Sequence, residues 1–484
     1  MDRKWRALIV VCVAIFMLLL DITVVNVALP DIQKELHASF TDLQWVIDAY
    51  ALMLAAVMLN AGTLGDLLGR KRVFVSGVVL FTAASAACGA ATSPLFLNLA
   101  RGAQGIGGAI MFAVSLAILS QEFHGRERGT AFGIWGATVG AAVAIGPLVG
   151  GVLTTWLGWR WIFFVNLPIG VLCVAGAIRE LHESRNEEHG GLDLPGFATL
   201  TGGLFALVLA LLRGNDWGWS SGRELALYVA AVVLLAGFVS IERRQREPML
   251  DFALFRVPTF AGAQIVAFAI SAAMFSLFIY LTLYLQNVLG YSPIQAGVRF
   301  LPLSLLSFFV APIAGRLSAR LPIRLLLGLG MALIGLALLL MHGLTTHSGW
   351  TELLPGFLVA GVGVGMVNAP LASTAVSVVE PRRAGMASGT NNTFRQMGIA
   401  TGIAGLGAIF QDTIKSNLHG TGSAQAVASG AVRGGEIARA AFISGLNEIL
   451  LVAAFVAFAG AVLGFVLVRR RDFVASGPAA ARDS

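Results

Sequence analysis

The chain has 484 residues, of which 57% are hydrophobic and only 12% are charged, which is about half the charged fraction of an ordinary soluble protein. This composition excludes a soluble enzyme, a disordered chain and a coiled coil. The formal net charge is +7, which in a soluble protein would suggest a nucleic acid partner. In a membrane protein basic loops instead fix the orientation, so we expect membrane lipids and no nucleic acid as partners.

Apolar runs of about 20 residues, the length that crosses a bilayer, recur along the whole chain. Basic residues precede the first run as in a signal peptide, but Asp21 interrupts this run and no small-residue cleavage site follows, so we expect a retained helix. The runs predict an all-α polytopic membrane protein with 14 transmembrane helices. Their approximate ranges are 6–29, 44–64, 74–92, 95–120, 130–153, 161–179, 195–213, 224–241, 259–285, 295–315, 323–342, 353–378, 388–410 and 441–468.

The loops between these spans differ in basic content. With an even number of spans both termini share a side, and the loops on that side hold roughly three times as many Lys and Arg residues as the others. Because basic loops stay in the cytoplasm, we expect both termini to be cytoplasmic. Tryptophans such as Trp45, Trp156 and Trp350 fall near the outer boundaries, as an aromatic belt should.

An internal repeat occurs at an offset of 256 residues. It aligns 128–146 with 384–402, and with them the glycine pairs Gly129/Gly385, Gly133/Gly389, Gly146/Gly402, Gly105/Gly361 and Gly107/Gly363. The repeat predicts two six-helix bundles, residues 1–180 and 259–484, with two further helices inserted within 181–258. This 6+2+6 arrangement has parallel halves related by an axis along the membrane normal.

The segment GTLGDLLGRKR, residues 62–72, joins the second and third spans on the basic side. An ordinary cytoplasmic loop would account for its three basic residues. It would not account for an acid and regularly spaced glycines, which permit close helix approach. We therefore favour a loop that takes part in a conformational switch, through Gly62, Gly65, Asp66, Gly69, Arg70, Lys71 and Arg72.

The fifth span contains GPLVGG, residues 146–151. Small residues let membrane helices approach closely, so ordinary packing is one interpretation. Proline within a span removes a backbone hydrogen bond and kinks the helix. The combination of Gly146, Pro147, Gly150 and Gly151 at one place is more specific than packing alone requires.

Ionisable residues inside the spans are the candidate functional residues, since each costs about 2.5–3.5 kcal/mol near the bilayer centre. Asp48 and Glu448 could reach the outer boundary by snorkelling, whereas the short side chain of Asp21 lies too deep, and a carboxylate there can exchange protons. Arg101 forms either a structural ion pair between helices or a link between protonation and movement. The ionisable residues within spans are Asp21, Asp48, Arg101, Arg395 and Glu448, with Arg299 near an outer boundary. Of these, we assign proton coupling or substrate binding to Asp21, Asp48, Arg101 and Glu448.

The energy source follows by exclusion. A phosphate-binding loop needs Gly-Lys-Ser/Thr, and none of Lys4, Lys34, Lys71 and Lys415 follows a glycine. No soluble segment is long enough to hold a nucleotide. We therefore expect that ATP is not the energy source. The three cysteines, Cys12, Cys88 and Cys173, form no spaced pair, so we also expect no metal site.

The chain resembles the major facilitator superfamily, in its branch of fourteen-helix drug:proton antiporters. The resemblance spans nearly the whole chain and rests on LDITVVNVALPDI (20–32), GTLGDLLGRKR (62–72), LARGAQGIGGA (99–109), GAAVAIGPLVGG (140–151) and WRWIFFVNLPIG (159–170). It implies that Asp21 binds protons or substrate and that Arg101 belongs to a coupling motif. It also implies that Asp66 and Arg70 belong to the conformational loop, and that Gly146 and Pro147 belong to the antiporter signature.

The resemblance further implies a multi-pass exporter of the bacterial inner membrane that expels lipophilic, often cationic drugs or antibiotics by alternating access, with the proton as the coupling ion and no cofactor. We expect a monomer, since the two halves already enclose a cavity. One alternative is an exporter dedicated to a single natural product or metabolite. A second is a receptor or scaffold without transport, which Asp21 and Arg101 argue against because charges in spans are costly to keep.

Overall fold

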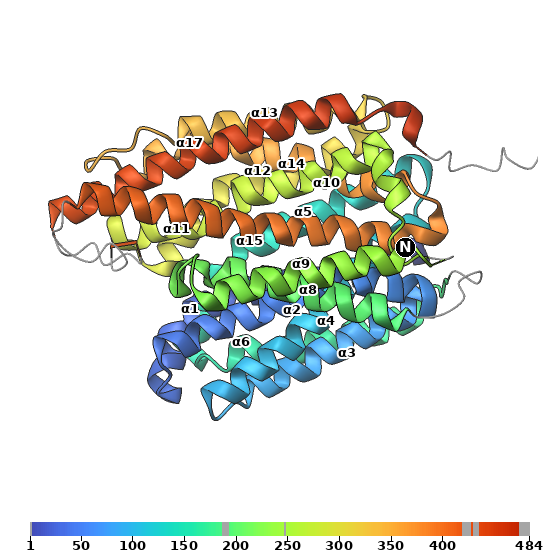
Figure 1. Ribbon diagram of the computed structural model, residues 1–484, viewed down its shortest axis with the longest axis horizontal. Helices are drawn as coiled ribbons and strands as arrows, with labels where there is room; N and C mark the ends of the chain where they lie inside the picture. Colours follow the sequence, from blue (N-terminus) through green and yellow to red (C-terminus); the bar gives the residue numbers. More distant parts are fainter. Residues whose placement is uncertain (1, 186–192, 246–247, 419–426, 429–434, 474–484) are drawn as a thin grey trace, which may run out of the picture.

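The computed structural model describes residues 2–185, 193–245, 248–418, 427–428 and 435–473, and these residues form helices without strands (Figure 1). The first half of the chain contains α1 (Arg3–Leu36), α2 (Phe40–Leu68), α3 (Arg70–Gly89), α4 (Pro94–Glu122), α5 (Gly125–Leu157), α6 (Trp161–Phe164) and α7 (Asn166–Glu180). Two further helices follow, α8 (Leu194–Trp217) and α9 (Gly222–Glu242).

The second half begins with the short turn η1 (Phe252–Arg256) and the continuous unit α10 (Pro258–Ile270), η2 (Ser271–Phe275), α11 (Leu277–Leu283) and η3 (Tyr284–Val288), in which η2 and η3 are π-helical. It continues with α12 (Pro293–Leu317), α13 (Ile323–Leu340), η4 (Trp350–Glu352), α14 (Leu354–Ser377), η5 (Pro381–Arg383), α15 (Ala384–Asn417), α17 (Glu436–Leu467) and η7 (Arg470–Asp472).

Each of the predicted spans coincides with one helical unit. Within the described residues 13 units are long and apolar enough to cross a membrane, whereas α5 contributes only the shorter apolar stretch Leu148–Leu157. The span predicted at 161–179 is broken between α6 and α7. Pro168 explains the break, because it has no N–H to donate to the carbonyl of Phe164, four residues earlier. The all-helical membrane fold is therefore confirmed.

The aligned glycines of the repeat occupy equivalent contacts between the two halves. A Cβ on Gly129 of α5 would lie 2.1 Å from the carbonyl oxygen of Gly315 in α12. A Cβ on its counterpart Gly385 of α15 would likewise lie 2.3 Å from the carbonyl oxygen of Gly62 in α2. Glycine permits this close backbone approach, so the first half meets the second along α5–α12 and along α2–α15.

The equivalence extends to contacts within each half. A Cβ on Gly105 of α4 would lie 2.4 Å from the carbonyl oxygen of Tyr50 in α2, and one on Gly361 of α14 would lie 2.4 Å from that of Leu303 in α12. The fourth helix of each half therefore packs on the second in the same register. The repeat is real, although the domain boundaries drawn from it stay a prediction.

The inserted helices lie beside the seam between the halves. In Figure 1, α8 and α9 run in green between the blue helices and the yellow-to-red ones, and α8 packs on both α2 and α15. Leu200 and Leu204 of α8 share a buried apolar cluster with Leu59 of α2 and Met386 of α15. One helix thus contacts both halves along the line where they meet.

Both described chain ends lie at one end of the helical bundle, here called the N-terminal end (right in Figure 1). Side chains tie this end together: Arg3 Nε donates to the carbonyl oxygen of Glu180 at 3.0 Å, and Thr259 Oγ1 donates to Asp472 Oδ2 at 2.8 Å. The opposite end carries the α1–α2 connection, where Trp159 Nε1 donates to Glu35 Oε2 at 2.6 Å. Which end faces the cytoplasm stays a prediction.

Candidate functional site

Asp21 and Arg101 form an ion pair inside the first half. Asp21 lies in the middle of α1, and its Oδ2 accepts from Arg101 Nη1 of α4 at 2.5 Å. The side chains are 0% and 2% exposed, respectively. The interhelical ion pair, one of the two interpretations of Arg101, is thus present. Such a pair is costly to bury but strongly destabilising to break.

Further polar groups complete the hydrogen bonding of this pair. Asp21 Oδ1 accepts from Gln104 Nε2 at 2.9 Å and from Asn166 Nδ2 of α7 at 3.1 Å. Arg101 Nε donates to the carbonyl oxygen of Val46 in α2 at 3.0 Å, and its guanidinium carbon lies 4.2 Å from the ring centroid of Tyr50. Contacts from α4 and α7 converge on the carboxylate and contacts from α2 on its arginine partner, and all of them come from the first half.

Asp66 and Arg70 form a second buried pair at the N-terminal end, between the two halves. Arg70 donates to Asp66 Oδ1 through Nε at 3.0 Å and through Nη2 at 2.8 Å. Asp66 also accepts from the backbone N–H groups of Gly385 at 3.0 Å and Met386 at 2.9 Å. These are the first N–H groups of α15, where a negative charge is stabilised by the helix dipole.

Arg70 extends the same contact, since its Nη2 donates to the carbonyl oxygen of Pro381 at 2.6 Å. The pair therefore links α2 of the first half to the start of α15 in the second. Gly62, one helical turn earlier in α2, permits the close approach to Gly385. The candidate switch loop thus lies at a contact between the halves.

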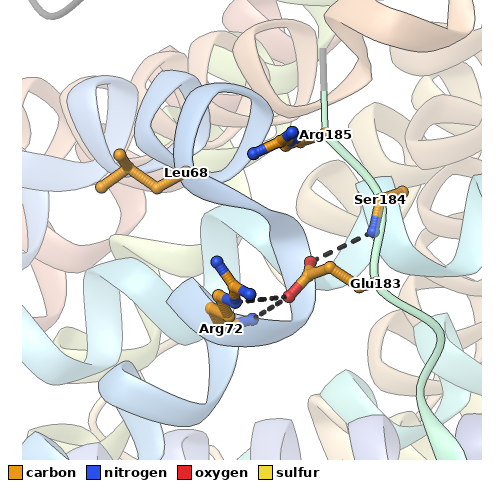
Figure 2. Close-up of a pocket in the computed structure, with 5 residues that line it drawn as sticks. All are labelled: Leu68, Arg72, Glu183, Ser184 and Arg185. Carbon is orange, nitrogen blue, oxygen red and sulfur yellow. Dashed lines mark hydrogen bonds and ion pairs between the residues drawn. The ribbon is translucent and has the colours of Figure 1, made fainter. Parts of the chain in front are cut away.

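The rest of the loop is held by the segment that follows α7 (Figure 2). Glu183 accepts from the backbone N–H groups of Lys71 at 3.1 Å and Arg72 at 3.2 Å, and so caps α3. Gly69 has a φ of 108° and its N–H closes α2, while the N–H of Arg70 donates to the carbonyl oxygen of Ser184 at 2.9 Å. A surface pocket of about 410 Å³ lies here.

The candidate GPLVGG signature of α5 contacts two different helices. A Cβ on Gly146 or Gly150 would collide with Thr23 or Val24 of α1, respectively, and one on Gly151 would lie 2.8 Å from Ile294 of α12. The side chain of Pro147 lies outside the described residues. Around Gly151, α5 is thus wedged between α1 of its own half and α12 of the other. Thr23 is only two residues from Asp21.

Asp48 pairs with Arg213, the last residue of the predicted span 195–213. Arg213, on the inserted helix α8, is 1% exposed, and its Nη2 lies 2.9 Å from Asp48 Oδ2. Its Nη1 donates to Gln44 Oε1 at 2.9 Å, and its guanidinium carbon lies 4.6 Å from the ring centroid of Trp45. Asp48 therefore anchors α8 on α2.

Glu448 is placed apart from the other candidate acids. Its side chain is exposed on α17, seven residues before Phe455, which is 67% exposed. Residues seven apart share a helix face, so Glu448 points outward along an apolar face. This position matches the snorkelling interpretation.

Among the described residues, Arg395 has a polar environment without an acid, which its sequence position did not indicate. It lies on α15, is 6% exposed, and donates through Nη1 to Asn368 Oδ1 of α14 at 3.1 Å. Its Nε and Nη2 have no hydrogen-bond partner among the residues that the structure describes. Arg299, by contrast, stacks on Tyr291 near the end of the helical bundle that lies opposite the N-terminal end.

Comparison with known proteins agrees with this architecture. Residues 11–403 match the Major Facilitator Superfamily. The chain is 38% identical over 417 residues to the multidrug resistance protein Stp of Mycobacterium tuberculosis, covering 85% of this chain and 77% of that one. It is 38% identical over 461 residues to the puromycin resistance protein pur8 of Streptomyces alboniger, covering 94% and 91%.

A third relative is the tetracenomycin C resistance and export protein of Streptomyces glaucescens, 34% identical over 490 residues with 95% and 91% covered. Among solved structures, the human organic anion transporter MFSD10 superposes with a TM-score of 0.67 at 15% identity, covering 96% of this chain and all of that one. That likeness concerns the fold. With the matched sequence, the two repeated halves and the antibiotic-resistance relatives, the chain is a multi-pass membrane transporter that belongs to the Major Facilitator Superfamily.

Proposed function

We propose that this protein exports lipophilic drugs or antibiotics from a bacterial cell in exchange for protons. The relatives carry names of multidrug, puromycin and tetracenomycin C resistance, which supports drug efflux. The buried pair of Asp21 and Arg101 supports proton coupling. A carboxylate buried in a span is costly, so its presence there indicates a function.

The coupling step uses the contacts of the pair. While Asp21 is ionised, it holds Arg101 and Gln104 of α4 against α1. A proton on Asp21 removes the charge that Arg101 neutralises. The conformation in which the ion pair holds α1 against α4 is then less favoured relative to the other conformation. A ligand, here a proton, shifts an equilibrium between conformations only by such a difference. In the described conformation Asp21 is enclosed, so the helices around it must move before a proton arrives.

Access alternates at the contacts between the halves. At the N-terminal end, Asp66 binds the start of α15 and Gly129 meets Gly315, so this end is closed. If this end is cytoplasmic, as the basic loops predict, the described conformation is closed toward the cytoplasm. Opening breaks the bonds from Asp66 to Gly385 and Met386, which exist only while the halves touch.

The driving force is sufficient for export. One charge moved through 100 mV supplies about 2.3 kcal/mol, enough for roughly fortyfold accumulation of a substrate. The protein needs no further subunit in this scheme, so we propose that a monomer is the working unit. An exporter for one natural product would use the same machinery and differ only in the width of its substrate range.

The expected preference for cations receives little support from the acids assigned to it. Asp21 is paired with Arg101, Asp48 is paired with Arg213, and Glu448 faces outward. Residues other than these three acids must therefore determine which substrate charge the protein recognises.

Purified protein in liposomes tests the proposal. Puromycin and tetracenomycin C, taken from the names of the relatives, serve as the first two compounds. With an imposed proton gradient we expect uphill accumulation of at least one compound, abolished by a protonophore. Accumulation that does not depend on the proton gradient would contradict proton-coupled export. So would a result in which cells expressing the protein resist none of the compounds in a broad toxic panel.

A further inference from the structure

Four arginines are buried within the helices of the described residues, and three of them pair with an acid. The pairs join Arg70 to Asp66 at 2.8 Å, Arg101 to Asp21 at 2.5 Å and Arg213 to Asp48 at 2.9 Å. Arg395 forms no ion pair with any described residue. It is the exception within an otherwise consistent pattern.

The guanidinium of Arg395 also lacks most of its hydrogen bonds. It carries five N–H donors, yet a single side-chain bond is formed, to Asn368 Oδ1. Its Nε and Nη2 are buried, and no group in the described part of the chain bonds to them. A buried charge that is neither paired nor hydrogen-bonded is strongly unfavourable, so this position is costly unless a ligand completes it.

Arg395 lies next to the seam between the two halves. Its partner Asn368 faces α5, since a Cβ on Gly136 would lie 3.6 Å from the Cβ of Asn368. One turn further along α5, a Cβ on Gly140 would lie 3.2 Å from Ser307 Oγ of α12. Arg395 thus lies close to the contact that α12 and α14 make with α5 of the first half.

The surface of α15 around Arg395 is polar but has no acid. Ser388, Asn392 and Arg395 are spaced four and three residues apart, so they share one helix face. Ser388 Oγ and both side-chain polar atoms of Asn392 are buried without partners, as is Asn368 Nδ2. These groups offer hydrogen bonds to a polar ligand, but they cannot neutralise the charge of Arg395.

We infer that Arg395 recognises the negative charge of the transported compound. The ligand class is a lipophilic organic acid, in which a carboxylate or ionised phenol is attached to an apolar frame. A guanidinium offers two parallel N–H donors to a carboxylate, and Nε and Nη2 are the two available here. Asn368, Asn392 and Ser388 bind the neighbouring oxygens. The inference rests on the proposed export function and assigns its substrate class, opposite in sign to the expected cations.

Binding to the purified full-length protein tests this assignment without requiring transport. The probes are pyrenebutyrate and its uncharged counterpart pyrenebutyramide, and saturable binding is measured by quenching of tryptophan fluorescence. The variants are Arg395→Gln, which keeps polar atoms without charge, and Arg395→Lys, which keeps charge without the fork. Lys415→Gln is the matched control, because Lys415 is an exposed base on the same helix.

In Arg395→Gln we expect the affinity for pyrenebutyrate to fall about tenfold or more, as the loss of a charge-assisted bond implies. Affinity for pyrenebutyramide should change less than twofold. Arg395→Lys should fall between, and Lys415→Gln should match the wild type. Unchanged thermal unfolding and a monodisperse elution profile show that the variants are folded.

Equal loss of acid and amide binding in Arg395→Gln would overturn the inference, because it would make Arg395 structural. Failure of the wild type to bind the acid more tightly than the amide would also overturn it. Neither result bears on export itself, which the liposome experiment measures. Conversely, charge-selective binding without any transport would refute the export proposal and leave the recognition of acids standing.

Discussion

Arg101 and Arg395 are the same kind of residue, each buried within a helix of one half, yet their surroundings differ in nearly every respect. Arg101 is neutralised by Asp21 and bonded to Gln104 and to the backbone of α2. Arg395 has one amide as its bonded partner and two donors without partners. A fully satisfied charge fixes a packing arrangement, whereas an unsatisfied one is available to a ligand. The comparison therefore favours the first half for the proposed proton coupling and the second half for the proposed substrate recognition.

The largest expected effect distinguishes the two arginines by stability. Arg101→Met leaves the Asp21 carboxylate buried without a counterion, and breaking a buried pair in this way costs about 3–5 kcal/mol. Arg395→Met removes a charge that no acid neutralises, so the protein should be as stable as the wild type or more stable. Thermal unfolding in detergent measures both. Equal destabilisation by the two variants would erase the distinction between them.

The Asp66–Arg70 pair is expected to have the next largest effect, on transport rather than on stability. Asp66→Asn weakens a charged cap on α15, a contribution of about 1–2 kcal/mol, and so shifts the balance between conformations. Transport should fall several-fold while substrate binding to purified protein persists. Glu183→Gln is the control, because Glu183 caps α3 within the first half and should leave transport closer to the wild type. Parallel loss of binding and transport in Asp66→Asn would indicate misfolding.

The Asp48–Arg213 pair should have a smaller effect. Arg213 is buried, but Asp48 has 18% of its side chain accessible, so nearby water screens this pair and its loss should cost less than the loss of the fully enclosed Asp21–Arg101 pair. Asp48→Asn should loosen α8 slightly and lower the unfolding temperature by a few degrees, without distinguishing cationic from neutral compounds. Selective loss of cation export would instead place Asp48 at the substrate.

Glu448 should matter least. Because it faces outward on α17, Glu448→Gln should leave resistance to every compound unchanged within twofold in a growth assay. A specific loss of resistance to cations would restore it to the substrate pathway, and would weaken the assignment of acidic substrates to Arg395.

The helices and the repeat could be predicted from the sequence because both follow from local rules. A span needs a long apolar run. Aligned glycines such as Gly129 and Gly385 indicate a close helix contact that is present in both halves. The depth of Asp21 was equally readable, since it depends only on position within the run. The acid and the spaced glycines of residues 62–72 singled out this loop, although the bonds from Asp66 to Arg70 and to the start of α15 are visible only in the structure.

The pairings could not be predicted, because they depend on how each helix is rotated and which helix it meets. Asp21 and Arg101 are 80 residues apart, and nothing local joins them. Arg213 ends the predicted span 195–213, while α8 continues to Trp217 and Arg213 is buried. Arg395 was recognised as a charge within a span, but its lack of a counterion is visible only in three dimensions.

The proton-coupling role of Asp21 is tested most directly by comparing two transport modes of Asp21→Asn in liposomes. One is downhill exchange of a substrate that the wild type transports, and the other is uphill accumulation under a proton gradient. An amide keeps the shape of the side chain and cannot exchange a proton, so downhill exchange should continue while uphill accumulation is lost. Uphill accumulation that persists in Asp21→Asn and collapses with a protonophore would contradict the account and place the coupling carboxylate elsewhere, with Asp48 the next candidate.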